Sequence, residues 1–534
     1  MNAALKARIA DKVRSSWPDA LIVGALLGLF GIVHRFVECV EIGGDAISKW
    51  HFVRQWSYEN DLSHAKWDHH YARMGVNGLT WLVQKIFGRN WRAYYVGPFF
   101  MAAGQLPLVY LIGKRLQGRA TGVLAALFIT FLGAVHRSAS QLLPDGYAGT
   151  YALLAAYLFM HFVGTDEKRA RLGWLIGVGV LAFIGYLTKE TFFFFYPAFV
   201  IALLFAGSGL KQGLRDVAVF CGVLLVGLGL ETLAYRTLTD YGSRLAVVRG
   251  THLAGADQEP LVLGLDGFVK PFVMLERDWQ VLLGVAFFGA VWLLVLNRQA
   301  RALGRLLALL GLCHVGFLAI STQLFQSPRP RYFDPVTPFA ALCAAAFVAA
   351  VVGKLGARGW ALALKRMPVL TRFAPGARPT VTALWASAAL LLVAGNVYRN
   401  QLKEPPFDGW AQGQRMAKLA NRTYDRNLPL AAPSRSAKTL MTLYDVYMDD
   451  KRLARDGVLP NYASVKRRSG RFTYIVRDPR AYGSKTFERL LDAGCVVQLR
   501  RGSRGKGTRG YTDTKAEDLP ASCDKLLAEN ARRK

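Results

Sequence analysis

Asp45, which follows two glycines, is the acidic residue in this sequence that most strongly suggests catalysis. It lies behind Gly43 and Gly44 in the polar stretch 38–90, between the first and second strongly apolar segments. A connection of this length between two membrane spans is more often functional than a plain connector, and glycines let the backbone approach a substrate closely. A carboxylate held at a membrane surface could act as general base for a hydroxyl that attacks a lipid-borne substrate. A solvated loop aspartate is the alternative interpretation.

Two basic side chains stand at the ends of apolar segments, at the level where a lipid head group would rest. Lys189 lies in the turn Thr188-Lys189-Glu190, and Arg331 precedes Tyr332 at the start of another apolar segment. Cations in such places can stabilise negative charge on the oxygens of a departing phosphate. The alternatives are that Lys189 snorkels toward water from a helix end and that Arg329 and Arg331 form a solvated basic turn.

Four further polar residues are weaker candidates. Asp145 precedes an apolar segment, where it could contribute a carboxylate to the acceptor or to a metal, or serve as an ordinary helix N-cap. Arg137, in the same predicted turn at 136–146, could face a phosphate. His69 and His70 offer metal-ligand side chains, although adjacent histidines on a loop more commonly form hydrogen bonds. The sequence therefore indicates no certain cofactor, and a divalent metal stays open.

Glu190 and the aromatic run after it are most simply structural. We expect Glu190 to pair with a neighbouring cation. The run from Phe192 to Phe195, followed by Tyr196, is typical of residues that face lipid or pack in a core. A wall that binds a lipid tail is the alternative.

The elements that must position these residues are membrane helices. Hydrophobic residues make up 52% of the 534 residues and charged residues only 19%, and several apolar runs approach the roughly 20 residues that cross a bilayer. The pattern predicts an α-helical polytopic membrane protein with about eleven spans. These are 19–37, 93–113, 119–136, 146–163, 172–187, 191–207, 214–235, 279–297, 302–324, 332–353 and 380–398.

The charges of the loops predict the orientation of these spans. The net charge is +31, but the basic residues fall largely in short loops, where they set topology and do not indicate nucleic acid. With a cytoplasmic N-terminus every inside loop is basic, as the positive-inside rule requires. Asp45, Lys189 and Arg331 then share the outer face of the cytoplasmic (inner) membrane. The first apolar run lacks a cleavage site, so we expect it to remain as an anchored helix.

The polar tail predicts a second domain. We expect a transmembrane catalytic domain at 1–398 and a small soluble α/β domain at 399–534 on the outer face. The predicted elements of the tail are helices at 410–424 and 486–493, strands at 471–477 and 495–500, and a disordered basic patch at 500–510. Cys495 and Cys523 share this domain, and an oxidising compartment would permit a disulfide between them that spacing alone does not establish.

The order of these features resembles the integral-membrane glycosyltransferases of the GT-C fold, especially the bacterial aminoarabinose transferase and protein O-mannosyltransferase group. The matching pieces, in chain order, are Gly-Asp-Ala at 44–46, the runs 78–88 and 113–119, Leu-Pro-Asp at 143–145, Leu-Thr-Lys at 187–189, and Arg331-Tyr332 with Pro335 and Pro338. The resemblance covers about residues 19–353. It implies transfer of a sugar from a polyprenyl-phosphate carrier to an envelope lipid, glycan or protein. Ala46 and the 68–71 stretch depart from the relatives' usual pattern, which leaves the sugar and the acceptor open.

We therefore predict a GT-C-like, inverting glycosyltransferase with a polyprenyl-phosphate-linked sugar donor, membrane lipids around it and no nucleic-acid partner. Asp45 would be the catalytic base. The predicted substrate-binding residues are Arg137, Asp145, Lys189, Arg329, Arg331, Tyr332, His69 and His70. The rival hypothesis is a transporter or flippase of a lipid-linked saccharide, but transporters tend to place ionisable groups near the bilayer midplane. A structural scaffold with a periplasmic binding module would leave the long first loop unexplained.

Overall fold

The structure is a computed structural model of the chain. It describes residues 3–37, 46, 49–50, 52–53, 70–88, 91–206, 209–238, 242–248, 269, 272–275, 277–296, 301–324, 330–366, 430–431, 473–476, 496–498 and 509–513. Five residues of the sequence-based predictions lie outside these ranges: Asp45, His69, Arg329, Cys495 and Cys523.

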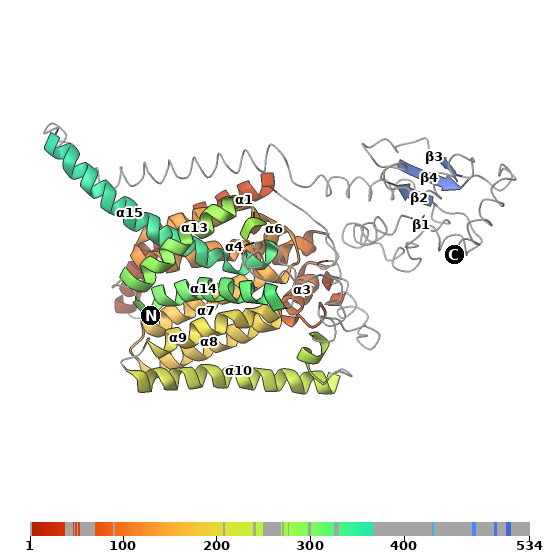
Figure 1. The fold of residues 1–534 in the computed structure, drawn as a ribbon, viewed down its shortest axis with the longest axis horizontal. Helices are drawn as coiled ribbons and strands as arrows, with labels where there is room; N and C mark the ends of the chain where they lie inside the picture. The colour runs from red at the N-terminus through yellow and green to blue at the C-terminus, as the bar shows by residue number, and fades with distance from the viewer. Residues whose placement is uncertain are drawn as a thin grey trace. The chain divides into compact units, whose positions relative to one another are not determined.

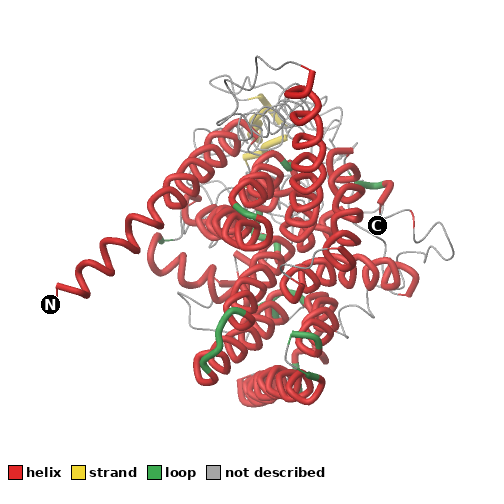
Figure 2. The backbone as a smooth tube through the Cα atoms, turned by 90° about the vertical axis from the view of Figure 1, so that its left-hand side faces the viewer, coloured by secondary structure: helices red, strands yellow, loops and turns green. Residues whose placement is uncertain are grey.

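The chain divides into two compact units, and the first of them, 1–38, 60–79 and 97–405, is helical (Figure 1 and Figure 2). Its first helices are α1 (Ala3–Val37), α4 (Trp91–Gln117, from residue 97 on), α5 (Arg119–Phe131), α6 (Gly133–Ser140), α7 (Pro144–Val163) and α8 (Lys168–Thr188). The 3-10 helix η1 (Glu190–Phe195), α9 (Tyr196–Leu204) and α10 (Leu210–Leu238) follow. The last elements are α13 (Arg277–Val291), the π-helical turn η2 (Trp292–Leu296), α14 (Arg301–Leu324), the 3-10 helix η3 (Pro330–Val336) and α15 (Thr337–Arg366).

The described helices make the chain a multi-pass integral membrane protein. Eight of them are long and apolar enough to cross a membrane, or up to nine if the bent pair α5–α6 is one span. These eight correspond to eight of the predicted spans. The predicted span 119–136 is the bent pair, and the predicted span 191–207 corresponds to the shorter apolar helix 190–204. The last predicted span, 380–398, lies outside the described residues.

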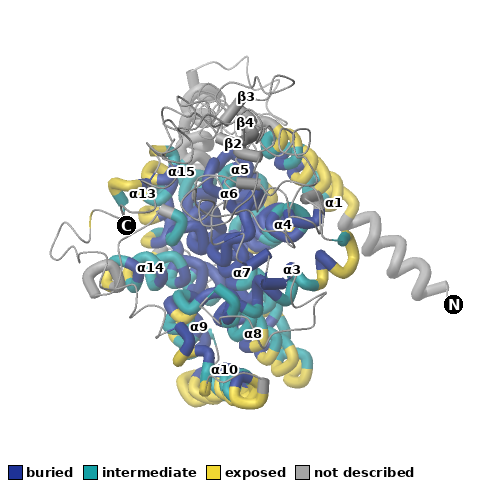
Figure 3. Tube along the Cα trace, turned by 90° about the vertical axis from the view of Figure 1, so that its right-hand side faces the viewer, coloured by how far each residue is buried: buried dark blue, intermediate teal, exposed yellow. Residues whose placement is uncertain are grey.

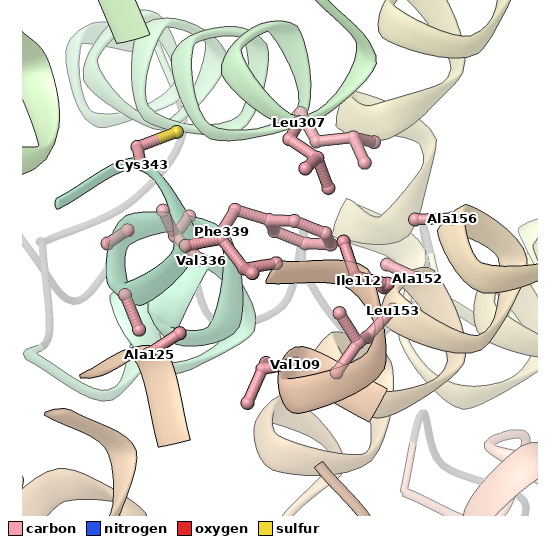
Figure 4. Packing of buried hydrophobic residues seen from close by; sticks show 14 of the residues in the cluster. Val109, Ile112, Ala125, Ala152, Leu153, Ala156, Leu307, Val336, Phe339 and Cys343 are labelled. Carbon is pink, nitrogen blue, oxygen red and sulfur yellow. The ribbon is translucent and has the colours of Figure 1, made fainter. Parts of the chain in front are cut away.

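Helix α7 lies in the middle of the first unit, whereas α10 lies at its edge. Figure 3 shows α7 in the colour of buried residues and α10 largely in that of exposed ones. Small residues such as Ala152 and Ala156 are fully buried on α7. In lipid the hydrophobic effect does not drive helices together, and small side chains allow the close backbone packing that does. Val109 of α4 and Phe339 of α15 belong to the same buried cluster as these alanines (Figure 4). Exposed leucines such as Leu230 leave α10 an apolar outer face suited to lipid.

A sharp bend of 65° separates α5 from α6. Leu132 is extended at this break, with φ −88° and ψ 120°. Breaking a helix frees backbone groups that must find other partners, and the Thr130 carbonyl lies 2.7 Å from Nε2 of His136. The predicted turn at 136–146 is therefore wrong in its first part, because Arg137 lies on helix α6.

The long stretch predicted as the first outside loop contains a helix, α3 (Met74–Phe87). Apolar and amide side chains recur on it every three or four residues, which is the spacing of one helix face. The buried members of this face are Val76, Asn77, Thr80, Val83 and Gln84. The helix ends at Gly88, whose φ of 81° suits a residue without a side chain.

The second unit, 39–59, 80–96 and 406–534, contains a four-stranded sheet. Its strands are β1 (Leu430–Ala431), β2 (Thr473–Val476), β3 (Val496–Gln498) and β4 (Arg509–Asp513), in the order β1-β2-β4-β3. β1 is parallel to β2, and β4 is antiparallel to β2 and β3, with Tyr474 opposite Tyr511. The strands predicted at 471–477 and 495–500 are confirmed. The basic patch predicted as disordered to residue 510 is wrong at its end, where β4 begins, and the predicted helices 410–424 and 486–493 lie outside the described residues.

Candidate functional site

A buried ion pair between Asp145 and Lys189 joins two neighbouring helices. Asp145 lies on the first turn of α7, and Lys189 is the C-cap of α8. The two helices follow each other through a short connection and pack together, so the N-terminus of one lies beside the C-terminus of the other. Nζ of Lys189 donates to Oδ1 of Asp145, and the side chains are only 6% and 2% exposed.

Both ordinary interpretations of this pair are wrong. The N-cap of α7 is Leu143, and no side chain caps the helix, so Asp145 turns its carboxylate to Lys189 instead. Lys189 is buried and points to Asp145, so it does not snorkel toward water. Burial lowers the pKa of Lys189, although the neighbouring Asp145 carboxylate acts to raise it. The pair therefore holds a lysine in a nearly dry place beside the start of a helix.

An aromatic ring covers the same lysine. Nζ of Lys189 lies 4.2 Å from the ring centroid of Tyr332, within the range of a cation–π interaction. Cζ of Arg331 lies 5.8 Å from that centroid. Arg331 is half-buried on η3, so it is less exposed than the alternative of a solvated basic turn supposes. A hydrogen bond also ties η3 to α14, because Nε2 of His314 lies 3.1 Å from the Tyr332 carbonyl oxygen.

A second buried carboxylate, Asp334 of η3, lies near this pair and was missed by sequence reasoning. Oγ of Ser138 donates to Oδ2 of Asp334 at 2.8 Å. The charges of Arg137, Asp145 and Lys189 all act on Asp334. The sequence does offer a signal for Asp334, because this residue lies only three positions after the candidate Arg331. The structure thus brings together Asp145, Lys189, Arg137, Arg331 and Tyr332 of the predicted site residues and adds Asp334 and Ser138.

Two glycines of α7 allow these segments to meet. A Cβ on Gly146 would lie 2.9 Å from Cβ of Ser138, and one on Gly149 would lie 3.0 Å from Cα and the carbonyl oxygen of Pro335. Real Cβ atoms essentially never approach another atom as closely as the first distance, and the second is tighter than nine in ten Cβ contacts. A larger residue at either position would therefore displace α6 or η3 from α7. The close approach of Ser138 and Asp334 to Asp145 therefore depends on glycine at both positions.

Glu190, next to Lys189, holds two arginines. Its Oε2 accepts from Nη2 of Arg73 at 3.2 Å, and its Oε1 accepts from Nη2 of Arg244 at 2.9 Å. The prediction that Glu190 pairs with a cation is confirmed, with two cations in place of one. The two guanidinium groups offset the cost of burying this carboxylate and favour its ionised form.

His70 is the described member of the predicted histidine pair. Its Nδ1 lies 3.4 Å from Nη1 of Arg73, so it belongs to the Glu190 network. Within the described ranges, no three His, Cys, Asp or Glu side chains group as metal ligands would. Asp45, His69 and Arg329 lie outside those ranges, and their roles stay predictions.

The helical fold and part of the sequence match known glycosyltransferases. Residues 74–231, which include Asp145 and Lys189, match the family model described as dolichyl-phosphate-mannose-protein mannosyltransferase. The structure is similar to "ArnT from Cupriavidus metallidurans in the apo state", with a TM-score of 0.58 and 12% identity, over 95% of this chain and 100% of that chain. The predicted resemblance to the GT-C membrane glycosyltransferases is confirmed.

Two further solved structures share this GT-C fold. ArnT from the same organism bound to undecaprenyl phosphate matches with a TM-score of 0.58 and 13% identity, over 95% of this chain and 99% of that chain. The apo oligosaccharyltransferase of Archaeoglobus fulgidus matches with a TM-score of 0.50 and 11% identity, over 95% of this chain and 76% of that chain. No curated protein sequence matches. At these identities the likeness establishes the fold alone.

Proposed function

We propose that this protein is a GT-C membrane glycosyltransferase that moves a sugar from a polyprenyl-phosphate carrier to an envelope lipid, glycan or protein on the outer face of the cytoplasmic membrane. The observation that carries the proposal is the buried Asp145–Lys189 pair beneath Tyr332, at a common end of helices arranged as in a GT-C enzyme. A lysine in so dry a place is poised to meet an anion that enters the membrane surface with its lipid.

The donor phosphate would be received by the cations of this site. Arg331 can engage two phosphate oxygens at once, whereas Lys189 acts as a point charge. Arg137 adds a third positive charge, which in the described structure acts on Asp334. Negative charge grows on the bridging oxygen as the sugar departs, so part of this interaction would exist only in the transition state. The solved complex of ArnT with undecaprenyl phosphate supports a lipid phosphate as the ligand class.

Asp45 would be the base that takes the proton from the acceptor hydroxyl, with inversion at the anomeric carbon. His69, His70 and Arg329 would complete the substrate site. Asp45→Asn keeps the size of the side chain but cannot accept the proton, so turnover should fall at least ~100-fold with unchanged expression. The assay incubates the purified protein with a panel of polyprenyl-phosphate sugars and extracted envelope lipids. Turnover of Asp45→Asn close to wild type would remove Asp45 from the mechanism.

The proposed orientation puts the amino terminus in the cytoplasm and the tail 399–534 outside, after eleven spans. A reporter fused after Asn400 should then read as outside and one fused after Ala357 as inside. The same side for both fusions would contradict the helix count and the common face of the site.

A transporter or flippase of a lipid-linked saccharide is the second candidate, because the broken helix pair α5–α6 is a feature of many transporters. The two functions differ in what Lys189→Met or Arg331→Gln would change. In a transferase, single-turnover transfer at saturating donor should fall more than donor binding weakens. Loss confined to binding, with an unchanged rate at saturation, would favour the transporter.

A further inference from the structure

Glu190 lies where three separate segments of the first unit meet. Arg73 immediately precedes α3, and its carbonyl oxygen accepts the backbone N–H groups of Val76 and Asn77 at 3.0 Å, so it belongs to the start of that helix. Arg244 belongs to the short segment 242–248, which follows α10. Glu190 begins η1, directly after the end of α8. One carboxylate thus connects the entry of α3, the segment after α10 and the turn that carries Lys189.

The two arginines are held firmly on the Glu190 side of the turn. Arg244 is only 1% exposed, its Nη1 donates to the Tyr186 carbonyl oxygen at 2.6 Å, and its guanidinium lies 4.5 Å from the Tyr186 ring centroid. The side chain of Arg73 is 8% exposed. A buried guanidinium that loses its carboxylate partner is strongly destabilised. Glu190 is therefore held from two directions at once.

The backbone of the turn transmits this hold to Lys189. Lys189 is the extended residue between the end of α8 and the start of η1, with φ −155° and ψ 137°. Its side chain points to Asp145 and Tyr332, whereas the next side chain, Glu190, points to Arg73 and Arg244. Fixing the direction of Glu190 fixes the direction of its neighbour.

We propose that Glu190 is a positioning residue for sugar transfer, which aims Lys189 at the donor phosphate by anchoring the opposite side of the turn on Arg73 and Arg244. The proposal rests on the proposed transferase function and deepens it. Glu190 itself touches neither donor nor acceptor in this arrangement. A purely structural ion pair would affect folding alone, whereas a positioning residue affects the rate of the chemical step.

The charges around Lys189 predict an effect that distinguishes this positioning role from a purely structural one. Arg73 and Arg244 are both cationic, and the charge of Arg73 already acts on Lys189. Glu190→Gln removes the carboxylate that the two arginines share and leaves Arg244 with Glu231, whose Oε1 lies 3.8 Å from its Nη1. The surroundings of Lys189 still become more positive by one charge and should attract an anion more strongly. At the same time the turn loses its anchor, and a displacement of the reacting groups by about 1 Å can slow a reaction about 100-fold. Binding and rate should therefore change in opposite directions.

The experiment compares Glu190→Gln with the matched control Glu167→Gln, which changes an exposed glutamate at the other end of α8. Affinity is measured with undecaprenyl phosphate, and the rate is measured by single-turnover transfer with the donor that the wild type uses. Glu190→Gln should bind undecaprenyl phosphate at least as tightly as the wild type and transfer sugar about 10- to 100-fold more slowly. Glu167→Gln should match the wild type in both.

A second variant keeps the test decisive if Glu190→Gln does not fold. Arg73→Lys keeps the charge but replaces the planar guanidinium fork by a single ammonium nitrogen, so it should fold and show a smaller loss of rate with unchanged affinity. A wild-type rate in Glu190→Gln, or a loss of rate fully matched by a loss of affinity, would overturn the inference. If the wild type itself transfers no sugar, the proposed function fails first, and the two failures are thereby distinguished.

Discussion

Two carboxylates of the first unit each bind a lysine from another helix, but they do so in different surroundings. Asp19 of α1 accepts from Tyr110 at 2.6 Å, from Lys114, and from Arg119 at 2.9 Å. The Lys114 and Arg119 side chains of this cluster are 38% and 50% exposed, and that of Asp19 is 14% exposed. The Asp145–Lys189 pair has the same chemistry, yet neither partner is more than 6% exposed.

This difference in exposure indicates which of the two pairs is suited to function. Exposed ion pairs contribute little to stability, and that little falls with salt. The Asp19 cluster therefore serves mainly to fix α1 against α4 and α5. A buried pair must offset the loss of water around both charges, so the Asp145–Lys189 pair is a costly way to join α7 to α8. In spite of this cost, the pair keeps the Lys189 cation in a site from which water is largely excluded.

The largest effect on stability should come from breaking the buried pair on one side. Asp145→Ala leaves Lys189 buried without its carboxylate, which should lower the free energy of unfolding by about 3–5 kcal/mol and abolish transfer. Thermal unfolding in detergent measures the first and the panel assay the second. The double variant Asp145→Ala with Lys189→Met should regain much of the stability and none of the activity. A single variant as stable as the wild type would contradict the assignment of a buried pair.

A smaller loss should follow from Ser138→Ala. This change removes the hydroxyl that donates to Asp334, and leaving a buried acceptor without its donor costs about 1–3 kcal/mol. We also expect slower transfer, because η3 carries Arg331 and Tyr332. Ser140→Ala is the matched control, since Ser140 lies on the same helix and donates only to a backbone carbonyl. Equal effects of the two variants on transfer would show that Asp334 has no special part in the site.

The smallest effect should come from the exposed cluster. Asp19→Asn keeps the side-chain shape and removes its charge, so the free energy of unfolding should change by no more than about 1 kcal/mol. Transfer should be unchanged within about twofold. This expectation fails if Asp19→Asn slows transfer as Asp145→Ala does. The contrast between the exposed cluster and the buried pair would then be invalid.

The sequence predicted the parts of the site that lie at the ends of apolar runs. Asp145, Lys189, Arg331 and Tyr332 stand out as candidates because span ends are visible in the hydrophobic pattern. Asp334 and Ser138 were missed because their meeting depends on close backbone approaches, at glycine positions whose purpose no pattern reveals.

The helices were predicted with the same limits. The eight long helices were found, because composition and length suffice for them. Helix α3 does not stand out as a helix in the sequence, because its buried face includes the amides Asn77 and Gln84, which lower its hydrophobic signal. The bend at Leu132 left Arg137 assigned to a turn. Both errors arose where polar side chains serve a tertiary contact that is remote in sequence.

The break at Leu132 also fixes the protons on two histidines. A carbonyl oxygen only accepts, so Nε2 of His136 must carry the hydrogen that it donates to Thr130. In neutral His136 this leaves Nδ1 bare, and Nδ1 of His34 lies 3.2 Å away. His34 must then be the Nδ1–H tautomer and donate across the gap between α1 and α6. One kinked turn of backbone thus dictates the tautomers of two imidazoles on separate helices, and imidazole ¹⁵N shifts would read them directly.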